Sequence, residues 1–114
     1  MWRDYSPTFY WQEGDSVFVY TSIFAPADLK KSVYHRWRWF SPHTRDWEVT
    51  DEISYEIIGG REGGYRGYTF KKQMMAGDWN VEVVTEEGLV LGSINFVVSE
   101  DSTQDAQNLV QETF

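Results

Sequence analysis

The chain has no cysteine among its 114 residues, and it has only two histidines, His35 and His43. The absence of cysteine excludes a disulfide framework, a thiol nucleophile and a zinc ribbon. The two histidines lie eight positions apart across a proline-containing segment, which is not a metal-binding spacing. We therefore expect no bound metal, and no motif in the sequence indicates a cofactor.

Basic residues are scarce, because 10 Lys and Arg stand against 18 Asp and Glu and give a net charge of −8. An acidic surface repels a phosphate backbone, so we do not expect nucleic acid as a partner. The chain also lacks a run of roughly 18 apolar residues, which is the length that crosses a bilayer as a helix. Any attachment to a membrane would have to come from another part of a longer protein.

Aromatic residues are abundant: the chain has six Trp, seven Tyr and seven Phe. They occur in short segments in which side chains of opposite character alternate, separated by glycine-containing turns. These segments predict strands at residues 8–12, 16–24, 33–40, 47–58, 65–72, 77–85 and 89–98. The glycine-rich stretch at residues 59–64 is typical of a hairpin turn.

About seven short strands without a long helix predict an all-β fold, an antiparallel two-layer β-sandwich of immunoglobulin-like form. Trp37 is the expected central core tryptophan. Residues 16–24 are apolar on both faces, which is typical of a central or covered strand. Residues 47–58 alternate most cleanly, with a bend expected near Asp51.

The composition changes near residue 98, where the last predicted strand ends. We expect residues 1–98 to form a single β-sandwich domain. Residues 99–114 are polar and contain four acids but no Lys or Arg. This acidic polar tail is predicted to be disordered or to form a short helix.

The order of several short motifs resembles that of a known bacterial family. They are Tyr20-Thr21, Val33-Tyr34-His35-Arg36-Trp37, and the segments at residues 58–61, 64–71, 77–81, 87–92 and 96–98. In this order and spacing the chain resembles the domain of unknown function 2914 family. The resemblance implies an accessory module that often follows membrane-spanning segments in a larger bacterial protein. It implies a periplasmic or membrane-associated location, with the cytoplasm as the alternative, and it assigns no activity.

His35 is the first candidate for chemistry, because it lies between aromatic residues in a predicted strand. A hydrogen-bonded structural histidine is the favoured interpretation, since no Ser or Cys nucleophile motif accompanies it. The alternative is a small hydrolase or lyase in which His35 is the base and Arg66 holds an anion. The glycines at residues 59–67 match no phosphate-binding motif, and no helix follows them.

A second candidate combines arginines with aromatic residues. If residues 33–40 and 65–72 lie in neighbouring sheet positions, a basic-aromatic surface results from Arg36, Arg38, Trp47, Tyr65, Arg66 and Tyr68. Such a surface suits a carboxylate, a sugar or a peptide. The competing interpretation, which the sequence favours, is that the rings fill the core while the arginines pair across strands with Glu48, Glu52 or Glu56.

The function expected from the sequence is a non-catalytic accessory or binding module of a bacterial envelope protein. We expect no catalytic residue, and the candidate ligand-binding residues are His35, Arg36, Trp47, Arg66 and Tyr68. A protein or a small polar or anionic ligand is the expected partner. The alternatives are a carbohydrate-binding module that uses exposed Trp39 and Trp47, and a structural domain that dimerises through an edge strand. The sequence leaves the oligomeric state open.

Overall fold

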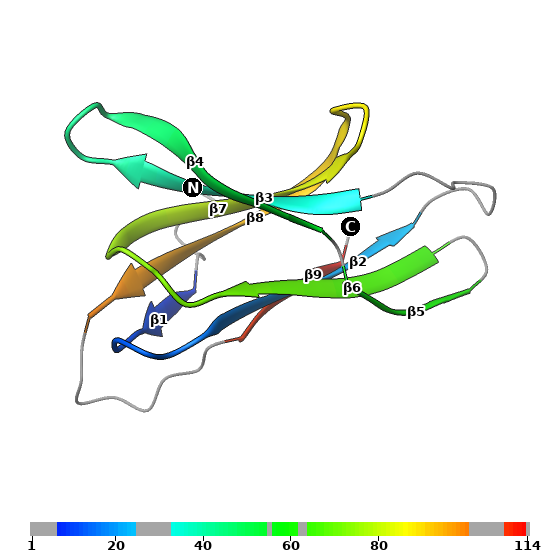
Figure 1. Ribbon diagram of the computed structural model, residues 1–114, viewed down its shortest axis with the longest axis horizontal. Coiled ribbons are helices and arrows are strands. Elements are labelled where there is room, and N and C mark those ends of the chain that lie inside the picture. The colour runs from blue at the N-terminus through cyan, green and yellow to red at the C-terminus, as the bar shows by residue number, and fades with distance from the viewer. Residues whose placement is uncertain (1–6, 25–32, 55, 62–63, 101–108, 114) are drawn as a thin grey trace.

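The computed structural model describes residues 7–24, 33–54, 56–61, 64–100 and 109–113 (Figure 1). These residues form nine strands and no helix. In chain order the strands are β1 (Thr8–Tyr10), β2 (Val17–Phe24), β3 (Val33–Ser41), β4 (Asp46–Ser54), β5 (Glu56–Arg61), β6 (Gly64–Lys71), β7 (Gly77–Thr85), β8 (Val90–Ser99) and β9 (Leu109–Thr113).

The strands form two sheets, which Figure 1 shows as separate layers. The five-stranded sheet has the order β1-β8-β7-β3-β4, and the four-stranded sheet has the order β5-β6-β2-β9. Neighbouring strands are antiparallel except β1 with β8 and β2 with β9. The run β8-β7-β3-β4 follows the G-F-C-C′ order of an immunoglobulin variable domain, and β5-β6-β2 follows D-E-B. The predicted all-β sandwich is confirmed.

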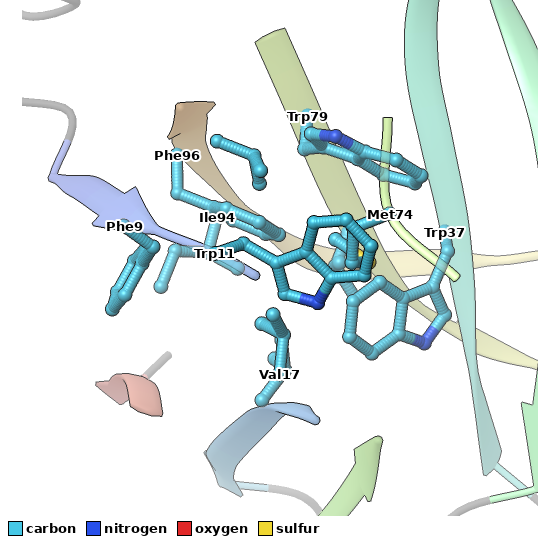
Figure 2. Close-up of a cluster of buried hydrophobic side chains, with 11 residues drawn as sticks. Phe9, Trp11, Val17, Trp37, Met74, Trp79, Ile94 and Phe96 are labelled. Carbon is cyan, nitrogen blue, oxygen red and sulfur yellow. The ribbon is translucent and has the colours of Figure 1, made fainter. Parts of the chain in front are cut away.

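The core lies between the sheets and is rich in aromatic rings. Trp37 of β3, Trp79 of β7 and Phe96 of β8 are fully buried. The Trp37 and Trp79 rings meet edge to face at 6.4 Å, while Trp79 stacks on Phe96 at 6.4 Å. Figure 2 shows Trp11 in the middle of the view, between Phe9 and Trp37, and both Phe9 and Trp11 belong to this cluster. Trp37 is therefore the central core tryptophan that the sequence predicted, held without a disulfide.

Residues 47–58, predicted as one bent strand, are divided between the two sheets. β4 ends at Ser54 beside β3, and β5 begins at Glu56 beside β6. The alternation of β4 is interrupted by a register shift where Asp51 is opposite Trp37 and Val49 is opposite Arg38, and Val49 is exposed. β5 and β6 are antiparallel neighbours, and Gly59, Gly60 and Gly64, which were expected in the turn, belong to these strands. Residues 62 and 63 lie outside the described residues.

The C-terminal segment needs a correction where the structure describes it. Leu109–Thr113 forms strand β9, not the short helix or disordered segment expected from its polarity. It pairs in parallel with Phe18–Ser22 of β2. Backbone hydrogen bonds to an open sheet edge favour a strand here even though few apolar side chains are present. Residues 101–108, which belong to the same prediction, lie outside the described residues.

Candidate functional site

The two sheets separate the residues of the predicted basic-aromatic surface. Arg36 and Arg38 lie on β3 and Trp47 on β4, in the five-stranded sheet, whereas Arg66 and Tyr68 lie on β6, in the four-stranded sheet. The condition on which that surface depended, that residues 33–40 and 65–72 are neighbours in one sheet, is not met. β3 pairs with β4 and β7, while β6 pairs with β2 and β5, so the two strands belong to opposite layers.

Arg36 is held by partners on both neighbouring strands. Its Nε donates to Glu52 of β4 at 3.1 Å, and one terminal nitrogen donates to Glu82 of β7 at 3.2 Å. The other terminal nitrogen donates to the Tyr34 hydroxyl at 3.2 Å. The hydrogen bond to Tyr34 is the main cause that raises the pKa of Arg36. Cross-strand pairing, the interpretation that the sequence favoured, therefore describes this arginine.

Arg38 continues the same polar network two residues further along β3. Its Nε and a terminal nitrogen donate to Asn80 Oδ1 at 3.0 and 2.7 Å, and Asn80 in turn donates to Asn95 of β8 at 2.8 Å. The guanidinium lies 5.1 Å from the centre of the Trp47 ring. Glu82 lies 3.6 Å from Arg38 as well as contacting Arg36. The two arginines are thus occupied by groups of their own sheet.

The tryptophans proposed for sugar stacking do not form a row. Trp47 is half-buried and meets Phe40 edge to face at 5.4 Å. Trp39 packs against the core cluster, and its Nε1 donates to the carbonyl of Ala76 at 3.1 Å. Trp39 is opposite Glu48 and Trp47 is opposite the next residue, Phe40, so the two tryptophans lie on opposite faces of the sheet.

His35 lies in the core and connects the two sheets. Its ring nitrogens contact the hydroxyls of Thr21 on β2, at 3.0 Å, and of Thr69 on β6, at 2.5 Å. Trp37 Nε1 donates to the same Thr69 hydroxyl at 3.0 Å. Burial lowers the pKa of His35 to about 4, so the imidazole is neutral at neutral pH. Arg66 is exposed, and the base-and-clamp pair of the enzyme hypothesis is not assembled.

The outer face of the four-stranded sheet carries a cluster that the sequence analysis did not assemble. It consists of Phe18 and Tyr20 on β2 and Tyr68 and Phe70 on β6, and we call it the aromatic face. Phe18 is opposite Phe70 with ring centres 5.1 Å apart, and Tyr20 is opposite Tyr68 at 5.2 Å. Both pairs are nearly parallel, and Phe18 also stacks on Tyr20 at 6.4 Å.

The aromatic face is open to solvent at one end and has a cation at the other. Phe70 is 45% exposed, and the other three rings are half-buried. Arg66 is exposed and lies opposite Ser22, two register pairs beyond Tyr20 and Tyr68 and therefore on the same face. β2 and β6 contain no acid, although the whole chain is acidic. The signal in the sequence was the apolar character of both faces of β2, which was explained there by a central or covered position.

In the part of the chain that the structure describes, no three His, Asp or Glu side chains are grouped closely enough to hold a metal ion. No helix that could cross a bilayer occurs within the described ranges.

Comparison with known proteins gives one match. Neither a curated protein nor a solved structure matches the chain. The sequence pattern of a family described as a protein of unknown function (DUF2914) matches residues 30–98, which include all of β3 to β8 except the last residue of β8. Because this match covers more than half of the 114 residues, the chain belongs to the DUF2914 family.

Proposed function

We propose that this domain is a non-catalytic binding module of a larger bacterial envelope protein, and that it binds through the aromatic face. The observation that carries the proposal is the open array of Phe18, Tyr20, Tyr68 and Phe70 on two adjacent strands. Aromatic rings stabilise a fold mainly when they are buried in its core. Here four rings lie on the side of the sheet that faces away from the core. Contiguous exposed apolar surface of this kind is typical of interaction sites.

A protein segment is the partner that this face suits best. Tyr, Phe and Arg are enriched in the centres of protein interfaces, and the face combines two Tyr and two Phe with Arg66 at its end. The stacked rings cover part of one another's faces, so their edges and the tyrosine hydroxyls are the parts that a partner can contact. Arg66 adds a site for a carboxylate of the same partner. The envelope location rests on the family resemblance.

The experiment compares two outward aromatic surfaces of the same protein. A displayed random-peptide library is selected on the wild-type domain, and the enriched peptides are then titrated against Tyr20→Ser/Tyr68→Ser and against Trp47→Ala. We expect the double variant to lose at least tenfold in affinity, about 1.4 kcal/mol, because it removes one of the two cross-strand ring pairs. The Trp47 variant removes an aromatic side chain from the other sheet and should bind normally.

Two results would contradict the proposal. Enriched peptides that bind the double variant as tightly as wild type would place the binding surface elsewhere. A glycan array that gives binding sensitive to Tyr20 and Tyr68, with no peptide enrichment, would replace the protein partner with a carbohydrate. Thermal denaturation of both variants shows whether a loss of binding reflects a loss of folding.

A further inference from the structure

Arg66 on β6 has small residues opposite it on both neighbouring strands. Its register partner on β2 is Ser22, and its register partner on β5 is Gly59. Arg36 on β3 is the contrasting case, because its register partners on β4 and β7 are both glutamates. Cross-strand pairs of opposite charge stabilise a sheet, and Arg36 has one on each side whereas Arg66 has none directly opposite it.

The charge of Arg66 is not neutralised within the part of the chain that the structure describes. Arg66 is exposed and forms no ion pair with another described residue. By contrast, Arg36, Arg38 and Lys71 lie 3.2, 3.6 and 2.8 Å from a carboxylate oxygen. The chain has 18 acidic residues, but β2 and β6 contain none of them. A chain rich in acids therefore leaves this guanidinium open beside the aromatic face, where it can bind a carboxylate of a partner.

The outward side chains of β2 and β6 lie in a line along the two strands. The line consists of three register pairs, which are Phe18 with Phe70, Tyr20 with Tyr68, and Ser22 with Arg66. Because a strand rises about 3.3 Å per residue, successive pairs are about 6.6 Å apart and the two ends of the line are about 13 Å apart. Polarity increases along the line, from phenyl rings through phenols to the hydroxyl and the guanidinium.

We propose, on the basis of the function proposed above, that the aromatic face binds an extended protein segment with an apolar side chain and an Asp or Glu four residues apart. A segment that runs along β2 and β6 has the same rise as these strands. Its side chains at every second position therefore stay in step with the three pairs. The apolar side chain packs on Phe18 and Phe70, and the carboxylate four positions away accepts hydrogen bonds from Arg66.

The first test selects the displayed random-peptide library in parallel on the wild-type domain and on Arg66→Glu. Peptides enriched on wild type should carry Asp or Glu four positions from a Phe, Leu or Ile. Peptides enriched on Arg66→Glu should carry Lys or Arg at the position of the acid. A helical peptide would need about nine residues to span the same 13 Å, so the spacing also reports the conformation of the bound segment.

The second test titrates a peptide enriched on wild type against Arg66→Glu and Arg45→Glu. Arg45 is exposed in the turn after β3, in the other sheet, so its reversal changes the net charge equally and leaves the aromatic face intact. We expect Arg66→Glu to lose about tenfold in affinity and Arg45→Glu to stay within about twofold of wild type. Replacing the acid of the peptide with lysine should restore most of the affinity for Arg66→Glu. Arg66→Gln repeats the loss without reversing the charge.

The results separate this proposal from the proposed function. Peptides that lose affinity for Tyr20→Ser/Tyr68→Ser but bind Arg66→Glu as tightly as wild type would leave binding by the aromatic face intact and overturn the acidic partner. Acids enriched about nine positions from the apolar residue would overturn the extended segment. Peptides that are insensitive to all of these changes would overturn the proposed function and this proposal together.

Discussion

His35 shows how a single buried side chain links stability to pH. The ring lies between sheets with two threonine hydroxyls as partners and is fully buried. Hydroxyls satisfy a neutral imidazole, but they do not supply the charge that an imidazolium would need in the core. The folded state therefore favours neutral His35, whereas the unfolded chain protonates it near pH 6.5.

The sign of the resulting pH dependence follows from this difference. The pKa of His35 is about 4 in the folded state and 6.5 unfolded, so the unfolded chain binds more protons between these values. The free energy of unfolding should therefore be highest above pH 6.5 and fall by about 3 kcal/mol as the pH decreases toward 4. Urea denaturation of wild type and His35→Gln at stepped pH measures this contribution.

The matched control for this prediction is His43→Gln. His43 is exposed in the turn after β3, so this variant removes an imidazole that is not in the core. Carboxylates titrate in the same range, and the comparison between variants removes their common effect. An unchanged slope in His35→Gln would show that this imidazole does not control acid stability.

Gly77 is a second residue whose surroundings restrict it. Its φ is +129°, and a Cβ at this position would lie 3.1 Å from Trp39 Nε1. Gly88 also has a positive φ, +94°, but nothing lies within 4 Å of its Cβ position. Gly77→Ala should lower the free energy of unfolding by about 1–3 kcal/mol, and by more than Gly88→Ala does. Both substitutions strain the backbone at a positive φ, but only the new methyl group at residue 77 also lies close to Trp39. If chemical denaturation gave the same loss of unfolding free energy for both variants, the contact with Trp39 would have no effect on stability.

At the level of strands, the sequence predicted most elements and the packing of the core. The alternation of residues 77–85 and the position of Trp37 were enough to place β7 and the centre of the sandwich. Period-two alternation does not show which strands are neighbours in a sheet. A strand that continues in one sheet and a strand that changes sheets have the same pattern, so residues 47–58 were predicted as one strand.

The candidate site was predicted less well for the same reason. The favoured interpretation placed the rings of Trp47 and Tyr68 in the core, whereas both are half-buried. Pairing between distant strands decides which of the candidate residues lie together. His35 is buried and hydrogen-bonded, as its favoured interpretation expected. The aromatic face requires the register between β2 and β6, in which Phe18 meets Phe70. That register is set by contacts far apart in sequence and is not encoded in either strand alone.

Among the described residues, an ion pair connects strands of opposite sheets. Lys71 of β6 lies 2.8 Å from Asp51 of β4, with 11% and 36% of their side chains exposed. The Lys71 ammonium also lies 5.4 Å from the centre of the Trp79 ring. A double-mutant cycle with Lys71→Met and Asp51→Asn should give a coupling energy of about 1 kcal/mol in urea denaturation. Additive losses would indicate that the pair does not hold the sheets together.

On the scale of the whole molecule, the net charge and the exposed apolar surface have opposite effects on association between copies of the chain. The chain carries −8 at neutral pH and has a pI near 4.6, while the aromatic face lies on strands without acids. Mutual repulsion keeps copies apart while the net charge is large. Light scattering should therefore increase as the pH is lowered toward 4.6 and should increase less for Tyr20→Ser/Tyr68→Ser than for Trp47→Ala. Identical curves for these two variants would mean that the aromatic face does not drive association.

The crossed indoles of Trp37 and Trp79 have an optical consequence. Their centres are 6.4 Å apart and their planes are inclined by 79°, which is close enough for the electronic transitions of the two chromophores to mix. Two transition dipoles that are near and not parallel produce paired circular dichroism bands of opposite sign. The fold thus contains its own spectroscopic reporter, which is lost once these two side chains separate and requires no attached label.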